Sequence, residues 1–194
     1  MSLVFICGPH GAGKTTLLDR LQATNKDIMV PTLVTASVKL HTTPADRIVL
    51  KTCLRAVENY EALQLANGQP DKITIGNRCI YDTLAYMNVY RKRGWITESE
   101  YSRIFNVTAQ VFPEGLQEPQ AIVLNPPFET VWSRLQGRWQ KGEKKWQEDD
   151  SEYCRLACQE YRNFKGNANV LYLSDNAVVP ELLEWLDVHR LEVV

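Results

Sequence analysis

Gly8-Pro9-His10-Gly11-Ala12-Gly13-Lys14-Thr15 is the stretch of sequence that decides the fold. It matches the pattern G-x-x-x-x-G-K-[ST] at every fixed position. Residues 3–7 precede it as a short apolar run typical of a buried parallel strand, and residues 14–24 follow with the apolar spacing of a helix. A strand that leads through a glycine-rich loop into a helix is the context in which this pattern binds phosphate.

The residue types of this loop suit a nucleoside triphosphate with Mg²⁺. Glycines let the backbone curl so that successive N–H groups point at phosphate oxygens, and the positive end of the helix dipole adds to the attraction. We expect Lys14 to reach the β- and γ-phosphates and the Thr15 hydroxyl to bind Mg²⁺. His10 stands at a variable position and is assigned no chemistry of its own. The residues expected to contact the nucleotide here are Gly8, His10, Gly11, Ala12, Gly13, Lys14, Thr15 and Thr16.

The rest of the chain lacks the motifs of a GTPase. D-x-x-G, which senses the γ-phosphate in such proteins, occurs nowhere. Asn25-Lys26-Asp27 is one residue too short for N-K-x-D and follows the first helix, too early in the chain to read guanine. We interpret it as a turn, and ATP is the expected nucleotide.

Apolar runs alternate with helical patterns along the whole chain. Strands are expected at residues 3–7, 28–30, 73–75, 121–124 and 170–173, and helices at 14–24, 46–66, 81–93, 97–112, 128–139, 151–164 and 179–190. Residues 32–46 are expected to be rich in loops. The alternation predicts an α/β fold, a parallel sheet with helices on both faces.

Length and composition indicate one ordinary globular domain. The chain has 194 residues, is 44% hydrophobic and 23% charged, and carries a formal net charge of −1. We expect a single domain over residues 1–194, in which the polar stretch at about 137–150 forms a mobile lid. The near-zero charge gives no overall attraction to nucleic acid or to an anionic membrane, and neither partner is expected.

The cysteines and the apolar runs favour a cytoplasmic protein. Five cysteines are scattered without a C-x-x-C pair, which predicts reduced, mostly buried thiols and no zinc site. No apolar run approaches the ~18 residues of a membrane-spanning helix, and the first residues lack the basic region of a signal peptide.

Two polar side chains follow the third expected strand. Arg78 and Asp82 come directly after it, and ligands of open α/β sheets bind at the carboxyl ends of the strands. Arg78 suits a phosphate or carboxylate because of its planar guanidinium, or it forms a surface ion pair. Asp82 is a candidate contact for Mg²⁺, for the edge of a base or for Arg78, or it only caps the next helix.

A basic face is expected on the helix that follows the fourth strand. Arg134, Arg138 and Lys141 share one face, while Trp132 and Trp139 lie on another and are expected to pack. A kinase needs mobile cations that close over the transferring phosphoryl group and exclude water. The alternative is a solvated charged face.

These segments resemble, in order, those of the P-loop deoxynucleoside kinases and thymidylate kinases. Asn77-Arg78-Cys79-Ile80-Tyr81-Asp82 looks like the Glu-Arg-Ser or Asp-Arg-Tyr segment of that group, and Tyr90-Arg91-Lys92-Arg93-Gly94-Trp95-Ile96 looks like its helix–glycine turn. Val123-Leu124-Asn125-Pro126-Pro127-Phe128-Glu129-Thr130, continuing to Arg134, Arg138 and Lys141, looks like its fourth strand, following helix and lid.

The resemblance implies a three-layer P-loop NTPase fold with a five-stranded parallel sheet and an arginine-rich lid. It also implies transfer of the ATP γ-phosphoryl group to a nucleoside or nucleoside monophosphate, and a homodimer formed through helices outside the sheet. Arg78 would steer the acceptor, while Arg134, Arg138 and Lys141 would bind the donor phosphates. Lys14, Arg78, Arg138 and Lys141 are thus the expected catalytic residues, and Arg78 and Asp82 the expected contacts of the acceptor.

Two positions depart from the family pattern. Val30-Pro31 stands where the deoxynucleoside kinases carry Glu-Pro, whose Glu takes the proton of the acceptor hydroxyl, and Asn77 replaces the acidic residue that helps to hold Mg²⁺. A phosphate acceptor needs no base, so the loss of the Glu favours a monophosphate unless Asp46 or Asp82 substitutes. The alternatives are a kinase of another small hydroxyl compound and a regulatory ATP-binding protein with little catalysis.

Overall fold

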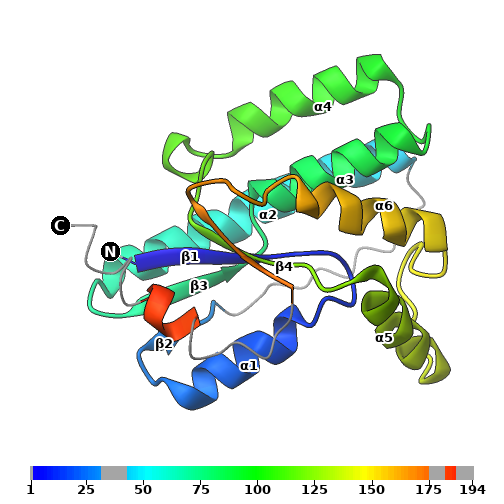
Figure 1. Ribbon diagram of the computed structural model, residues 1–194. Coiled ribbons are helices and arrows are strands. Elements are labelled where there is room, and N and C mark those ends of the chain that lie inside the picture. Colours follow the sequence, from blue (N-terminus) through cyan, green and yellow to red (C-terminus); the bar gives the residue numbers. More distant parts are fainter. Residues whose placement is uncertain (1, 32–42, 175–181, 187–194) are drawn as a thin grey trace.

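A five-stranded parallel sheet forms the centre of the molecule. The computed structural model describes residues 2–31, 43–174 and 182–186 (Figure 1). The strands lie in the order β2-β3-β1-β4-β5, and every neighbouring pair is parallel. They span β1 Ser2–Cys7, β2 Ile28–Met29, β3 Ile73–Asn77, β4 Ala121–Leu124 and β5 Val170–Leu173. The predicted α/β fold and its five parallel strands are confirmed.

Helices connect the strands and end close to the predicted residues. They are α1 Lys14–Thr24, α2 Pro44–Gly68, α3 Ile80–Lys92, α4 Glu98–Val111, α5 Phe128–Gln140 and α6 Ser151–Arg162, with a short 3₁₀ turn η1 Glu114–Leu116. Helix α2 begins two residues earlier than expected because Thr43 accepts a hydrogen bond from the Asp46 N–H and Pro44 suits a first turn. The predicted capping box of Thr97 and Glu100 opens α4.

Two predicted segments fall partly outside the described residues. Residues 182–186 are helical, as expected for the last helix, whose other residues lie outside the described part. Of the stretch expected to be rich in loops, residues 32–42 also lie outside it, whereas residues 44–46 belong to α2. No helix in the described ranges is long and apolar enough to cross a membrane.

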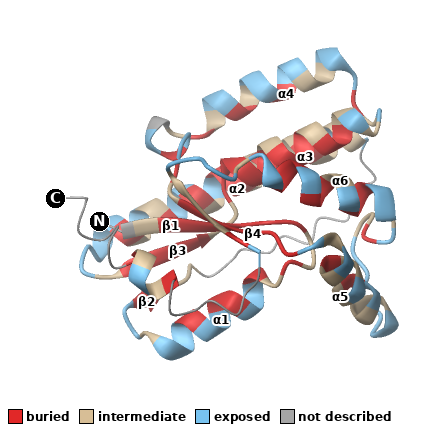
Figure 2. Cartoon of the chain, in the orientation of Figure 1, coloured by how far each residue is buried: buried red, intermediate tan, exposed pale blue. Residues whose placement is uncertain are grey.

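The sheet separates two apolar layers. On β1, Phe5 and Cys7 belong to the layer under α2, α3 and α6, while Val4 and Ile6 belong to the layer that contains α1. This alternation follows from the two-residue period of a strand. Figure 2 shows the buried strands between helices that are buried on the sides facing the sheet. Helix α4 packs on α2 and α3 and forms an outer layer (Figure 1).

The strands also set the position of the site. Because β1, β3 and β4 are parallel neighbours, the segments that follow them lie at one edge of the sheet. The phosphate loop follows β1, Arg78 follows β3, and the approach to α5 follows β4. The three segments that the sequence singled out therefore converge.

Candidate active site

The loop between β1 and α1 has the backbone that its glycines predict. Gly8, Gly11 and Gly13 all have positive φ angles, of 145°, 75° and 100°. A Cβ on Gly8 would lie 2.1 Å from the Leu124 carbonyl oxygen, so a larger residue there would collide with β4. Gly13 offers no side chain to cap α1, which leaves the first N–H groups of that helix for an anion.

Lys14 lies beneath this loop. Its side chain is only 9% exposed, and its Nζ donates to the carbonyl oxygens of Gly8 and Pro9, each at 2.8 Å. Burial lowers the pKa of Lys14 well below its usual range, and the positive charge of Arg78 lowers it further. An anion bound by the loop would favour the charged form of Lys14. Thr15 and Thr16 lie exposed at the start of α1.

Arg78 is held in place by Asp82. Arg78 adopts a left-handed backbone with φ of 70°, and its Nη1 lies 2.7 Å from Asp82 Oδ1. The buried Asp82 also accepts hydrogen bonds from the Cys79 N–H at 3.2 Å and the Tyr161 hydroxyl at 2.5 Å. Burial alone would raise the pKa of Asp82, but the net effect of the surrounding cations, Arg78 first, is to lower it. Asp82 therefore caps α3 and orients Arg78 as well.

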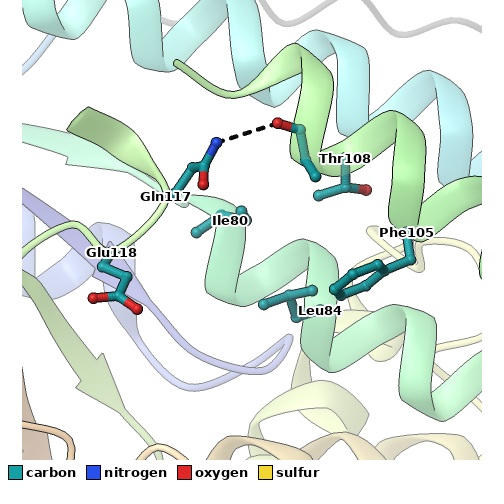
Figure 3. A pocket seen from close by; sticks show the side chains of 7 residues that line it. Ile80, Leu84, Phe105, Thr108, Gln117 and Glu118 are labelled. Carbon is teal, nitrogen blue, oxygen red and sulfur yellow. Dashed lines mark hydrogen bonds between the residues drawn. The ribbon is translucent and has the colours of Figure 1, made fainter. Parts of the chain in front are cut away.

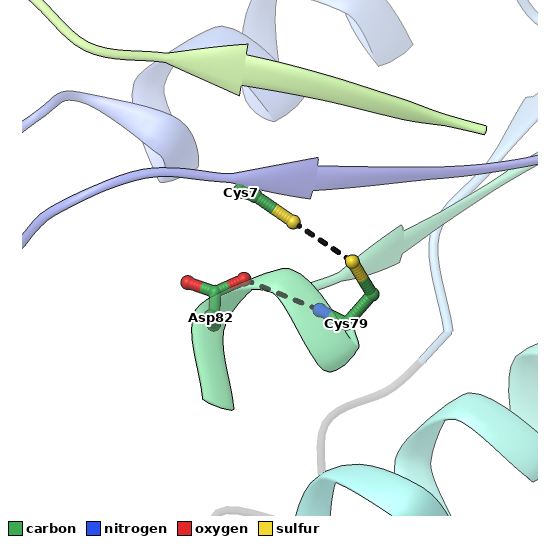
Figure 4. A group of neighbouring side chains, drawn as sticks. All are labelled: Cys7, Cys79 and Asp82. Carbon is green, nitrogen blue, oxygen red and sulfur yellow. Dashed lines mark hydrogen bonds between the residues drawn. The ribbon is translucent and has the colours of Figure 1, made fainter. Parts of the chain in front are cut away.

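Two thiols, those of Cys7 and Cys79, lie beside Asp82, as Figure 4 shows. Cys7 Sγ and Cys79 Sγ are 3.1 Å apart, and ligand atoms of both lie within 4.8 Å of a carboxylate oxygen of Asp82. Burial raises the pKa of Cys7 well above its usual range, which disfavours the thiolate that a metal requires. Asp82 already pairs with Arg78. The group is best described as packing, and its cysteines are free thiols, as predicted.

The basic face of α5 contacts the phosphate loop directly through one of its three residues and indirectly through a second. Arg134 Nη1 donates to the Ala12 carbonyl oxygen at 2.7 Å, and Arg138 forms an ion pair with Glu148. Lys141, which follows the last residue of α5, is exposed and points to no described partner. Trp132 and Trp139 pack edge to face at 5.1 Å between ring centroids, as predicted.

Glu148 joins the polar segment after α5 to the phosphate loop, which the sequence did not predict. Its buried carboxylate lies 3.3 Å from His10 Nδ1 and also binds Arg138. Burial lowers the pKa of His10 to about 4, so at neutral pH the imidazole is uncharged and donates a hydrogen bond. Burial alone would raise the pKa of Glu148, but His10 and Arg138 bring it to about 2. In the sequence, Glu148 is one acidic residue in a polar stretch, and no motif marks it.

Neither of the two carboxylates that the sequence offered as a substitute base, Asp46 and Asp82, is free. Val30 follows β2 and packs against the apolar layer around α1. Asp46 is engaged at the start of α2, where its Oδ2 accepts from the Thr43 hydroxyl at 2.7 Å. Asp82 is bound by Arg78 and Tyr161. Asn77, which stands where the family carries an acid, has a buried side-chain oxygen without a hydrogen-bond partner.

Aromatic side chains close the side of the site that faces α3 and α6. Trp146 contacts Tyr90 and Trp95, with ring centroids 5.5 and 5.4 Å apart, and Tyr153 contacts Trp95 at 5.4 Å. Trp146 therefore anchors the polar segment after α5 to α3.

A hollow of about 380 Å³ lies elsewhere, between the start of α3 and α4 (Figure 3). Gln117 closes one end of it by donating to the Ala109 carbonyl oxygen at 3.2 Å. The hollow offers neither a cation nor a nucleophile. Its lining consists of Ile80, Leu84, Phe105, Thr108, Ala109, Gln117 and Glu118.

The loop, the sheet order and the converging arginines define a P-loop nucleotide-binding protein with a kinase-like fold. The chain belongs to the AAA domain family, whose model matches residues 4–155. None of the curated proteins compared with it matches.

Three similar solved structures are of deoxyadenosine kinase from M. mycoides. The structure with bound dATP is 16% identical, with a TM-score of 0.68 over 98% of this chain and 99% of that one. The structure with the products dCMP and dCDP is 15% identical to this chain. The structure with bound dCTP is 17% identical. Each of the two has a TM-score of 0.59 over 99% of this chain and 100% of the other. At these identities the likeness establishes the fold.

Proposed function

We propose that the protein is an ATP-dependent phosphotransferase that moves the γ-phosphoryl group to a nucleoside or a nucleoside monophosphate. The observation that carries the proposal is the convergence of Lys14, Arg78 and Arg138 from three segments at one edge of the sheet. Cations on several sides of one position suit the charge that spreads over a transferring phosphoryl group. The ligands of the M. mycoides deoxyadenosine kinase structures are of the same nucleotide class.

In this proposal each segment has one task. The N–H groups of the loop and Lys14 hold the donor phosphates, with Arg134 bracing the loop at Ala12. Arg78 orients the acceptor and Asp82 holds Arg78 in place. Arg138 exchanges its bond to Glu148 for one to the donor phosphates, which brings the lid over the reaction.

The residues present also fit Mg²⁺. Thr15 offers a hydroxyl at the start of α1, and the unpartnered side-chain oxygen of Asn77 offers a neutral ligand, direct or through water. When bound with ATP, Mg²⁺ neutralises charge on the phosphates. The protein side chains supply the remaining positive charge.

The test is the release of ADP from Mg²⁺-ATP in the presence of nucleosides and nucleoside monophosphates. We expect at least one acceptor to stimulate ADP release, and Lys14→Ala to abolish the stimulation. ADP release only with some other hydroxyl compound would assign the protein to a different kinase class.

A regulatory ATP-binding protein is the second candidate. It is favoured by the engagement of both candidate bases, Asp46 and Asp82, and by Asn77 at the acidic position. Tight ATP binding without ADP release for any acceptor would support it and refute the kinase.

A further inference from the structure

Helix α2 carries a row of cations that the sequence motifs do not include. Arg47, Lys51 and Arg55 are spaced by four residues, so they lie on one face of the helix over about 12 Å. This face borders α3 and the loop: Arg55 Nη1 donates to Thr83 Oγ1 at 2.9 Å. The row thus extends toward the place where Arg78 enters the site.

Arg55 is buried without an ion pair to any described residue. Its side chain is 7% exposed, and its described polar partner is the neutral hydroxyl of Thr83. Across residues 2–31, 43–174 and 182–186, neither Arg55, Arg47 nor Lys51 forms an ion pair with a carboxylate. A guanidinium is rarely buried unless an anion compensates it, which points to an anion supplied by a ligand.

The cations of α2 are close enough to act on one another and on the loop. Burial lowers the pKa of Lys51, and Arg55, Arg47 and Arg78 lower it further. Arg78 and Arg55 also lower the pKa of Lys14. Two carboxylates oppose these charges: Asp82, which Arg78 already holds, and Glu58. Positive charge therefore remains in excess beside the phosphate loop.

We propose that Arg55, Lys51 and Arg78 form a binding site for the phosphate group of the acceptor, so that the acceptor is a nucleoside monophosphate. This inference rests on the proposed function and narrows it. A neutral nucleoside would leave Arg55 without a direct ionic partner, whereas a phosphate monoester dianion would supply one next to the phosphate loop.

The reaction then balances without a base. An oxygen of the acceptor phosphate attacks the γ-phosphorus of ATP and forms a new P–O–P bridge. The bond from that phosphorus to the β,γ-bridging oxygen breaks, and the electron pair leaves with ADP. A dianionic phosphate has no proton to lose at its attacking oxygen, which agrees with Val30 at the position of the family's Glu.

The experiment compares Lys51→Gln with Lys26→Gln by calorimetry on the full chain. Lys51 is exposed on α2, so its replacement spares the core, and Lys26 is an exposed lysine in the turn after α1. The probes are AMP, CMP, UMP, GMP, dTMP and their nucleosides, each added in the presence of ADP. We expect at least one monophosphate to bind, and its nucleoside to bind with at least tenfold lower affinity. Lys51→Gln should lower the affinity for that monophosphate at least fivefold. Lys26→Gln should bind as the wild type does.

A second variant probes the buried member of the row. Arg55→Lys keeps the charge but loses the planar fork, and we expect it to raise the KM for the monophosphate while the KM for ATP stays within twofold. Its melting temperature checks that the chain is folded.

The outcomes separate this inference from the proposed function. Binding of a monophosphate that depends on Lys51, without phosphoryl transfer, supports the phosphate site and refutes the kinase. Phosphorylation of nucleosides without Lys51-dependent binding of monophosphates supports the kinase and overturns the phosphate site. If none of the six monophosphates binds, the phosphate site is overturned as well.

Discussion

Each of three cations in this site, Lys14, Arg78 and Arg138, has a polar partner in the structure. Lys14 is bound to the carbonyl oxygens of Gly8 and Pro9, Arg78 to Asp82, and Arg138 to Glu148. A bound nucleotide would offer stronger partners to Lys14 and Arg138, because phosphate oxygens carry full negative charge. Arg78, by contrast, is fixed by a fully buried carboxylate and stays in place.

Replacement of Lys14 by alanine is expected to lower phosphoryl transfer by ~10²–10³-fold or more. The reason is the loss of a cation aimed at the transferring group. The rate of ADP formation at saturating ATP and acceptor measures this. A buried lysine also contributes to packing, so a circular dichroism spectrum identical to that of the wild type is needed to show that the variant is folded. An unchanged rate in a folded variant would contradict the role of Lys14.

Glu148 is expected to make stability depend on pH. Its pKa is lowered from 4.5 to about 2 in the folded state, because His10 and Arg138 favour its charged form. A carboxyl group whose pKa is lowered by folding stabilises the folded state at pH values above its pKa in the unfolded chain. This stabilisation is lost as the pH falls from about 4.5 through 2. Wild type should therefore lose more unfolding free energy than Glu148→Gln between pH 6 and pH 3. Urea denaturation at both pH values measures the difference, and parallel losses would contradict the ion pair.

At the scale of elements, the site is where three connections meet. The β1–α1 loop, the β3–α3 turn and the start and end of α5 come together because their strands are neighbours. Helix α5 contributes at two points: Arg134 near its middle binds the loop, and Arg138 in its last turn faces Glu148. Helix α5 is thus joined to the loop directly by Arg134 and indirectly, through Glu148 and His10, by Arg138.

Arg138→Ala is expected to lower kcat by ~10²-fold and to leave the KM for ATP within about threefold. Arg138 acts on the charge that develops during transfer, while the N–H groups of the loop and Lys14 carry most of ATP binding. Steady-state kinetics separate the two constants. Arg103→Ala on α4, exposed and remote from the loop, serves as the control; an effect on KM alone would assign Arg138 to binding.

For the whole molecule, sequence alone predicts the parts that depend on local pattern. The phosphate loop has fixed spacing, and the strands and most helix ends follow from apolar runs, prolines and caps such as Thr97. Glu148 and Arg55 could not be found in this way, because their burial depends on partners far along the chain, His10 and Thr83. Periodicity shows which face of a helix is polar but not which charge that face meets.

A homodimer through helices outside the sheet remains a prediction of the family resemblance. Phe105 on the outer helix α4 is 47% exposed beside an apolar hollow, which offers surface for such a contact. We expect sedimentation velocity to show a dimer at micromolar concentration, and Phe105→Glu to shift it toward the monomer. A monomeric wild-type chain would contradict the prediction.

The measurement that tests the central claim most directly is mass spectrometry of the acceptor after incubation with Mg²⁺ and ATP labelled with ¹⁸O in the γ-phosphoryl group. We predict that a nucleoside monophosphate gains one phosphoryl group that carries the label, and that Lys14→Ala yields no such product. Label found only in inorganic phosphate, with every acceptor unchanged, would contradict phosphoryl transfer and leave an ATP-binding or ATP-hydrolysing protein.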